Sequence, residues 1–263
     1  MNAKIPAALA FLVLFALHSP ADDWPTYLRD NNRVGASSEN LTFPLKPDWT
    51  LSPPEKPEQA WPGPEGREIE RKKLRRRNTF DDAFHVAVVG DRLFYGSSVD
   101  HQVHCLNLET GKKIWTFFTE GPIRLAPTIH EGKLYIGSDD GYAYCLNASD
   151  GTLVWKLRPG SSEERIIGRQ QFVSRWPIRT GVSIQADAEH GAVAYFGAGV
   201  FPHELVYLYA VRASDGKVIW KLDNISQDSA GRNDLSPQGY LLTTEDILVV
   251  PSGRSLPAVF DRK

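Results

Sequence analysis

The sequence lacks the usual signs of a helical protein. It contains a single Met in 263 residues, and few long apolar runs have helical spacing. It is rich instead in Gly (21), Pro (18), Phe (12), Tyr (9) and Trp (7). That composition is typical of many short strands joined by tight turns, so we expect an all-β chain of one large domain or two ordinary ones.

The sequence also lacks an excess of charge of either sign. A formal net charge of -2 over mixed signs argues against a protein whose whole surface binds nucleic acid. The basic run Arg67 to Arg77 could bind an anionic polymer or lipid headgroups, but it has no aromatic residues for base stacking. We favour a solvated linker at this run, and we expect no nucleic-acid partner.

Long hydrophobic runs are confined to the first residues. Met1 to Lys4 give a short positive start, and Ile5 to Leu17 are almost all apolar. Ser19 and Ala21 place small side chains where signal peptidase cleaves, so residues 1–21 are predicted to be a signal peptide rather than a buried helix. The run is too short to span a bilayer. We expect an exported protein of the periplasm, cell envelope or extracellular space, with no transmembrane span after cleavage.

Self-similar segments recur along the rest of the chain. Each reads as a turn, a strand ending in Gly, a second turn, an alternating strand, a Gly turn and a strand that carries Trp. With a preceding strand, this is a four-stranded antiparallel meander, the unit that stacks radially as a blade of a β-propeller. The copies lie at Gly90–Phe117, Gly132–Leu157, Gly191–Leu222 and Thr244–Arg262, with first strands expected at Val86–Val89, Leu125–Ile129, Thr180–Ile184 and Tyr240–Thr243. The fourth copy lacks its Trp, so residues 85–263 predict an incomplete propeller of about three and a half blades.

The Gly turn and the Trp of each copy have a structural explanation. An acidic or hydroxyl side chain beside Gly suits a tight hairpin that requires positive φ. Four residues later, a Trp on the outer strand can bury its ring between blades while its N–H donates to a carbonyl of the neighbouring blade. The docking pairs are Gly111 with Trp115, Gly151 with Trp155, and Gly216 with Trp220.

The spacing of the Trp residues reveals an insertion. Trp115 and Trp155 are 40 residues apart, whereas Trp155 and Trp220 are 65 apart. Known propeller repeats span about 40–50 residues. Residues 158–176 are therefore expected to form an extra loop that is either functional or poorly ordered.

The sequence has only two cysteines. Cys105 and Cys145 occupy the same register of successive repeats, where the separation between blades is usually too large for disulfide geometry. A disulfide would suit an oxidising compartment. We nevertheless expect two small buried thiols.

The repeats resemble a known family. The segments ETGKKIW, SDGTLVW and SDGKVIW, with the strands FYGSS and YIGSDDGYAYCL, are similar to the tryptophan-docking repeats of PQQ-like β-propeller proteins. That family includes the outer-membrane assembly lipoprotein BamB and the quinoprotein alcohol dehydrogenases. DWPTYLRDNNRVG, AWPGP, GPIRLAP and YFGAGVFPHE look closest to large exported members of the planctomycete type.

The resemblance implies a role for residues 22–84, the N-terminal closing segment and basic linker. In closed members, a segment such as Trp24 to Gly35 packs with the last blade and helps to close the ring. Because a last blade is missing here, we expect a fragment of a longer propeller protein. Quinoprotein dehydrogenases hold Ca²⁺ and PQQ beside an adjacent Cys pair, which this sequence lacks, so the resemblance leaves both cofactors unsupported.

Candidate ligand residues lie in loops near the inner strands, where propellers bind partners. Acidic side chains of the Ser-Asp-Asp-Gly turn could bind Ca²⁺, although Asp also stabilises such turns through its own backbone. Arginines there could clamp a carboxylate or phosphate, or else pair with local acids such as Asp100 or Asp140. The histidines show no spacing typical of zinc. The candidates are Asp100, Arg124, Asp139, Asp140, Arg175, Arg179 and Arg254.

No set of nucleophile, base and electrophile is recognisable, so no catalytic residue is predicted. We expect a non-catalytic exported propeller that binds an unknown protein or envelope component as a scaffold. One alternative is a quinoprotein-like oxidoreductase whose PQQ and Ca²⁺ site is completed by missing blades. A second alternative is the propeller module of a larger enzyme.

Overall fold

The structure is a computed structural model that describes residues 22–60, 68–69, 72–73, 81–168, 171–201, 204–223, 225, 235–253 and 255–262. The predicted signal peptide and the candidate Arg254 lie outside these residues, as does most of the basic run. The described part of that run is a short antiparallel pair, β1 (Glu68–Ile69) and β2 (Lys72–Lys73).

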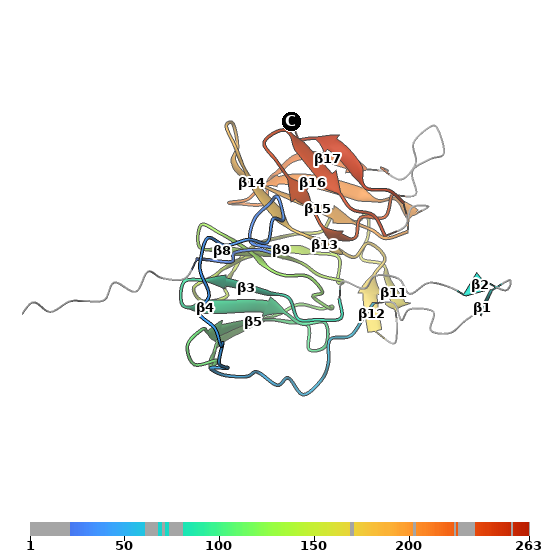
Figure 1. Cartoon of the computed structure of the whole chain (residues 1–263). Coiled ribbons are helices and arrows are strands. Elements are labelled where there is room, and N and C mark those ends of the chain that lie inside the picture. The colour runs from blue at the N-terminus through green and yellow to red at the C-terminus, as the bar shows by residue number, and fades with distance from the viewer. Residues whose placement is uncertain are drawn as a thin grey trace, which may run out of the picture.

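Four antiparallel sheets follow one another along the chain and form consecutive blades (Figure 1). Within each sheet the strands pair in chain order, from an inner to an outer strand. Blade 1 contains β3 (Val86–Val89), β4 (Arg92–Gly96), β5 (Gln102–Asn107) and β6 (Lys113–Phe118), and blade 2 contains β7 (Thr128–His130), β8 (Lys133–Gly137), β9 (Ala143–Asn147) and β10 (Leu153–Leu157). Blade 3 contains β14 (Ser183–Asp187), β15 (Gly191–Ala198), β16 (Tyr207–Arg212) and β17 (Val218–Asp223), and the three-stranded blade 4 contains β19 (Leu242–Thr243), β20 (Ile247–Val250) and β21 (Ala258–Asp261). The prediction of an all-β, incomplete propeller with four-stranded blades is confirmed.

Alternating side chains explain how the blades stack. Successive residues of a strand point to opposite faces of its sheet. In β8, Leu134 and Ile136 belong to the apolar cluster shared with blade 1, whereas Tyr135 belongs to the cluster shared with blade 3. Cys105 and Cys145 are fully buried in these two clusters as free thiols, which confirms the prediction for them.

The inner strands differ from their predicted ranges. The range Leu125–Ile129 is wrong at its start, because β7 begins at Thr128, directly after a Pro that has no N–H for the ladder. The ranges predicted for blades 3 and 4 each cover two elements. Their first residues form β13 (Thr180–Gly181) and β18 (Gly239–Tyr240), which pair with each other in parallel and thereby tie the entry of blade 3 to that of blade 4.

Residues 24–33 lie along the inner strands of all four blades. Trp24 forms an antiparallel bridge with β3, and the Thr26 hydroxyl lies 2.9 Å from that of Thr128 in β7. The Asn31 side chain donates to the Ile184 carbonyl in β14, and its backbone carbonyl accepts the Thr243 N–H of β19 at 3.2 Å. The resemblance placed this segment against the last blade, whereas the structure shows it against every blade.

The insertion at residues 158–176 contains regular structure. Its strands β11 (Arg165–Gly168) and β12 (Gln171–Ser174) pair antiparallel, and Figure 1 shows them beside the blades. These residues were expected to form an extra loop that is either functional or poorly ordered, and within them the structure shows a paired β-hairpin.

Candidate functional site

Each docking Trp reaches the following blade. Trp115 on β6 donates its indole N–H to the carbonyl of Ala148 at 3.1 Å, and Trp155 on β10 donates to Ala213 at 2.9 Å. Trp220 on β17 makes the corresponding bond to blade 4 at 3.4 Å. These rings and their N–H groups are therefore committed to holding neighbouring blades together.

The docking glycines leave room for these rings. Gly151 and Gly216 have φ angles of 75° and 73°, in the left-handed region that favours Gly. A Cβ at Gly151 would lie 2.5 Å from the Trp115 ring, and one at Gly216 would lie 2.8 Å from the Trp155 ring. Each Gly therefore serves its own turn and also the Trp of the preceding blade.

Gly111 has the same environment, but its Trp comes from the N-terminal segment. A Cβ at Gly111 would lie 2.8 Å from the ring of Trp49, whose indole N–H donates to the Leu108 carbonyl at 2.7 Å. Trp49 was not among the predicted docking residues. The sequence does contain an indication of this role, because Trp49 is followed two residues later by Leu, as are the docking Trp residues of blades 2 and 3.

Buried charges gather where the loops into blades 2 and 3 meet. Arg124 and Arg179 each follow a Pro-Ile pair, and both approach Asp139 in the turn between β8 and β9. The Nε of Arg124 donates to Asp139 at 2.7 Å, and Arg179 donates through Nε and Nη2 at 2.8 and 2.9 Å. These three side chains are at most 5% exposed.

Asp139 is stabilised in its ionised form. Burial alone would raise its pKa, but the guanidinium groups of Arg179 and Arg124 outweigh burial and hold the pKa below its ordinary value. Arg124 also lies 3.2 Å from Asp81, which accepts the Ala60 N–H at 2.7 Å. Two cations therefore face two buried carboxylates, an arrangement that balances charge within the fold.

Two of the other predicted ligand residues are held by their own turns. Asp140 accepts the Tyr144 hydroxyl at 2.7 Å and the Tyr142 N–H at 2.9 Å, and burial raises its pKa. Asp100, in the turn before β5, lies 2.9 Å from Nε2 of His104 in that strand. Its described partner is thus a histidine rather than one of the arginines at Asp139.

Arg175 also has acidic partners. Its guanidinium lies 2.8 Å from Glu164 and 2.9 Å from Glu204. The interpretation that arginines pair with local acids holds, but Asp100 and Asp140 were the wrong acids. Their carboxylates turn back onto their own strands, which leaves other carboxylates nearer to the arginines.

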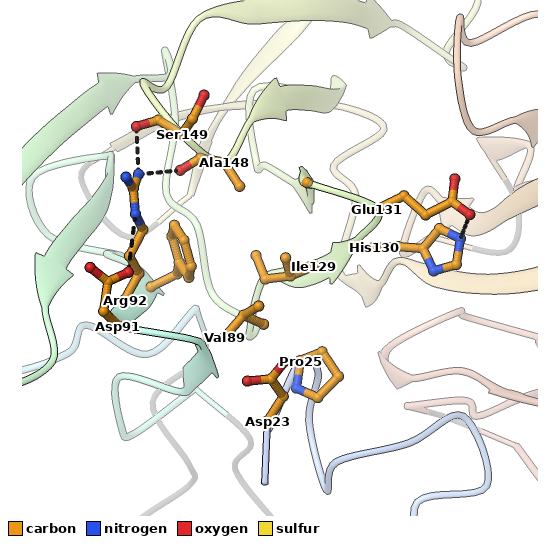
Figure 2. Close-up of a pocket in the computed structure, with 12 residues that line it drawn as sticks. Asp23, Pro25, Val89, Asp91, Arg92, Ile129, His130, Glu131, Ala148 and Ser149 are labelled. Atoms are coloured by element: carbon orange, nitrogen blue, oxygen red, sulfur yellow. Dashed lines mark hydrogen bonds and ion pairs between the residues drawn. The ribbon is translucent and has the colours of Figure 1, made fainter. Parts of the chain in front are cut away.

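An open cleft lies between blades 1 and 2, at the turns on the side away from Asp139. Its volume is about 400 Å³. Val89, Phe94, Ile129 and Pro25 supply apolar surface, and Figure 2 shows Arg92 reaching across to the carbonyls of Ala148 and Ser149. The remaining polar lining residues are Asp23, Asp91, His130 and Glu131. An apolar floor beside carboxylates is chemically suited to a side chain with an aliphatic stem and a positive end.

The hairpin of the insertion carries exposed apolar side chains. Ile167 and Phe172 face each other across its two strands and are 74% and 65% exposed. The hairpin is anchored to blade 2, because the Ser174 N–H donates to the Asp139 carbonyl at 2.7 Å. Cross-strand partners share one face, so the pair forms a single apolar patch.

The part of the chain that the structure describes contains no group of three or more His, Cys, Asp or Glu side chains arranged to hold a metal ion. No helix in those residues is long and apolar enough to cross a membrane.

Comparison with known proteins gives partial matches. The chain is 27% identical over 135 residues to tetrathionate hydrolase of Acidithiobacillus ferrooxidans, a match that covers 51% of this chain and 22% of that protein. It is 32% identical over 80 residues to the outer membrane protein assembly factor BamB of Escherichia coli, covering 27% of this chain and 20% of BamB. The chain thus spans about a fifth of each relative's length.

The quinohemoprotein alcohol dehydrogenase of Comamonas testosteroni has a similar fold, with a TM-score of 0.54 and 14% identity over 87% of this chain and 35% of that one. The family model described as outer membrane protein assembly factor BamB matches residues 59–238, more than half of the chain. The repeat geometry and this match agree, and the chain belongs to the BamB family of PQQ-like repeat proteins.

Proposed function

We propose that this chain is a propeller module of an exported protein, which binds a protein partner in the cell envelope and performs no catalysis. The family is described as an outer membrane protein assembly factor, which supports both a protein partner and an envelope location. The first 21 residues, with their positive start and apolar run, support export.

The observation that carries the proposal is the exposed apolar pair on the β11–β12 hairpin. A large apolar side chain on a projecting hairpin is exposed to water unless a partner covers it, and such patches mark interaction sites. Ile167 and Phe172 are both more exposed than buried, whereas strands inside the propeller, such as β8 of blade 2, are buried on both faces. The hairpin is an insertion, so blade packing does not account for it.

The charged residues support a non-catalytic role. Arg124 and Arg179 direct their N–H groups at Asp139, and Arg175 is held between two glutamates. A clamp for a substrate carboxylate or phosphate requires guanidinium groups that face an open site. These groups face carboxylates of the protein instead.

PQQ and Ca²⁺ fit the described residues poorly. The inner strands of all four blades are lined by residues 24–33 of the chain itself. Tyr27 stacks on Tyr240 with ring centroids 3.7 Å apart, and the Tyr240 hydroxyl accepts the Ala126 N–H at 2.8 Å. A planar cofactor at these inner strands would have to displace that packing.

Site-directed photocrosslinking in cells tests the proposed role. A photoreactive amino acid at Phe172 is expected to give a discrete crosslinked band with a second protein in the envelope fraction. The matched control is Leu153, which is 46% exposed on the outer strand of blade 2 and is expected to give no such band. Equal labelling at both positions, or none at Phe172, would contradict the hairpin as the partner site.

A second measurement separates binding from oxidoreductase activity. The purified protein is titrated with PQQ and Ca²⁺ while absorbance and the reduction of an artificial electron acceptor are recorded. We expect no new absorbance band and no alcohol-dependent reduction. A saturable band together with dye reduction would overturn the non-catalytic assignment.

A further inference from the structure

The cleft between blades 1 and 2 differs in chemistry from the junction between blades 2 and 3. Its lining lies within residues 23–149, and both blades are complete four-stranded sheets. At the junction of blades 2 and 3, the Ala213 carbonyl accepts the Trp155 indole N–H at 2.9 Å and the Tyr135 hydroxyl at 3.2 Å. Phe94 holds the position of Tyr135 in blade 1, two residues before the Gly that ends its strand. It has no hydroxyl, so this junction requires another donor.

Arg92 is that donor. Its Nη1 donates to the Ala148 carbonyl at 3.1 Å, and the same carbonyl accepts the Trp115 indole N–H at 3.1 Å. Nη1 also donates to the Ser149 carbonyl, and Figure 2 shows the side chain crossing to both. Because Arg92 takes the place of a hydroxyl on the ring, Phe94 remains an apolar part of the lining. The one guanidinium in the cleft is therefore bound to the neighbouring blade.

Carboxylates surround the apolar floor of this cleft. Figure 2 shows Asp91 and Glu131 on opposite sides and Asp23 beside the N-terminal segment. Asp91 is 79% exposed and lies 3.7 Å from Arg92, whereas Glu131 is 82% exposed and lies 3.8 Å from Nε2 of His130. Three carboxylates thus face a single guanidinium, which leaves an excess of negative charge around the floor. The cleft favours a ligand with a positive charge.

The arrangement of these groups selects among positively charged ligands. A guanidinium prefers both oxygens of one carboxylate, but one oxygen of Asp23 already accepts the Gly90 N–H at 2.8 Å. An ammonium is a compact charge that needs only single oxygens. Val89 and Ile129 on the floor offer contact to the methylene groups of an alkyl chain. Together they fit a primary ammonium at the end of an aliphatic chain.

We propose that this cleft binds a lysine side chain of a protein partner, with its methylenes over Val89 and Ile129 and its ammonium among the carboxylates. Sites for free small ligands enclose most of the ligand surface, whereas this cleft is open. A side chain presented by another protein fills such a cleft from one side. The inference rests on the proposed function, because it requires a protein partner. It adds a second contact away from the β11–β12 hairpin, which is anchored at Asp139.

Nuclear magnetic resonance titration of the purified chain tests the site without a protein partner. The probe is lysine blocked as its Nα-acetyl N-methylamide, and the signals followed are the methyl groups of Val89 and Ile129. We expect saturable shifts of both signals. Acetylation of the probe's ammonium, or shortening of its stem to a single methylene, is expected to weaken binding at least about fivefold. The absence of saturable shifts, or equal affinities of the three probes, would overturn the proposal.

Substitutions around the cleft distinguish this site from a general attraction to acidic surface. Glu131→Gln and Asp23→Asn each remove one charge, and the Asn side-chain oxygen can still accept the Gly90 N–H. Each is expected to raise the Kd of the lysine probe about twofold to fivefold. The matched control is Glu109→Gln, which removes an exposed acid outside the cleft, in the turn between β5 and β6, and should leave the Kd unchanged. Equal effects of Glu109→Gln and Glu131→Gln would contradict a specific site.

Proximity labelling in cells identifies the occupant. An aryl fluorosulfate amino acid at Asp91 reacts with nucleophilic side chains that it contacts, and mass spectrometry of the conjugate locates the modified residue. We expect a bond to a Lys of a second protein in the envelope fraction. Conjugates confined to Tyr or His of the partner, or to this chain alone, would contradict a lysine as the occupant. The titration requires no partner, so a failed crosslink at Phe172 leaves it unchanged and the two proposals fail separately.

Discussion

Replacing Gly151 with Ala is expected to weaken the junction between blades 1 and 2. The substitution introduces a Cβ at a φ of 75°, where an L side chain is strained. That Cβ would also stand 2.5 Å from Trp115, closer than van der Waals contact allows. The ring cannot move away freely, because its N–H is bound to the Ala148 carbonyl. Both backbone strain and overpacking therefore oppose the folded state.

Gly132→Ala separates these two contributions. Gly132 has a φ of 71°, nearly the same backbone conformation, but no atom lies within 4 Å of the position of its Cβ. Left-handed strain costs about 1–2 kcal/mol at either site. Overpacking against the Trp ring adds about 1–3 kcal/mol at Gly151 alone. We expect a total loss of about 2–5 kcal/mol for Gly151→Ala and only the first part for Gly132→Ala.

Urea unfolding followed by Trp fluorescence and by far-ultraviolet circular dichroism measures both losses. The difference between the two losses of stability is the free-energy cost of placing a methyl group against the Trp115 ring. Combining Gly151→Ala with Trp115→Leu should recover part of that difference, because the smaller side chain makes room for the methyl group. Equal losses for Gly151→Ala and Gly132→Ala would refute the claim that this Gly is required by the docked ring.

Three further predictions concern Asp139, the two cysteines and Trp49. The pKa of Asp139 is held below its ordinary value in the folded state, so the stability that its ionised form gives is present above the unfolded-state pKa and is lost as pH falls through the folded-state pKa. In urea titrations, Asp139→Asn should flatten this acid dependence and lower the free energy of unfolding at neutral pH by about 3–5 kcal/mol. An unchanged dependence of stability on acid pH would contradict this prediction. Burial raises the pKa of Cys105 to about 11 and that of Cys145 to about 12. Both thiols should therefore react slowly with a thiol reagent at neutral pH until the protein is unfolded. Rapid labelling of the native protein would contradict this prediction. Trp49→Phe removes the N–H that donates to Leu108 and should lower the free energy of unfolding by about 0.5–1.5 kcal/mol. Unfolding is followed here by far-ultraviolet circular dichroism, so that the loss of one fluorescent Trp does not enter the measurement, and an unchanged free energy of unfolding would contradict the docking role of Trp49.

The blades could be predicted from the sequence because their determinants are local. A Gly turn and a Trp four residues later appear together in the first three copies, and short strand periods surround them. The hairpin at residues 165–174 was missed as a structured element, because two short strands of mixed polarity carry little signal in a single sequence. Its position as an insertion was nevertheless visible from the Trp spacing.

The charged cluster could be predicted only in part. Arg124, Arg179 and Asp139 were recognised as residues near the inner strands, but their mutual contact joins positions that are 15 and 40 residues from Asp139. The sequence could not distinguish Asp139 from Asp140 as the partner of the arginines, because the two residues are adjacent and their side chains point in opposite directions. Only the fold decides which of two adjacent carboxylates turns inward to the arginines and which turns back to its own strand.

The N-terminal segment contacts both the inner and the outer side of blade 1. Trp24 pairs with the inner strand of blade 1, and Trp49 docks beside Gly111 at the outer side of the same blade. The segment therefore spans blade 1 from its inner to its outer side. Among the described residues, no other blade covers the face of blade 1 that carries Tyr95 and Leu106, yet these side chains are only 7% and 4% exposed. Residues outside the blades therefore bury that face, so substitutions at Trp24 or Trp49 should weaken blade 1 more than blade 2.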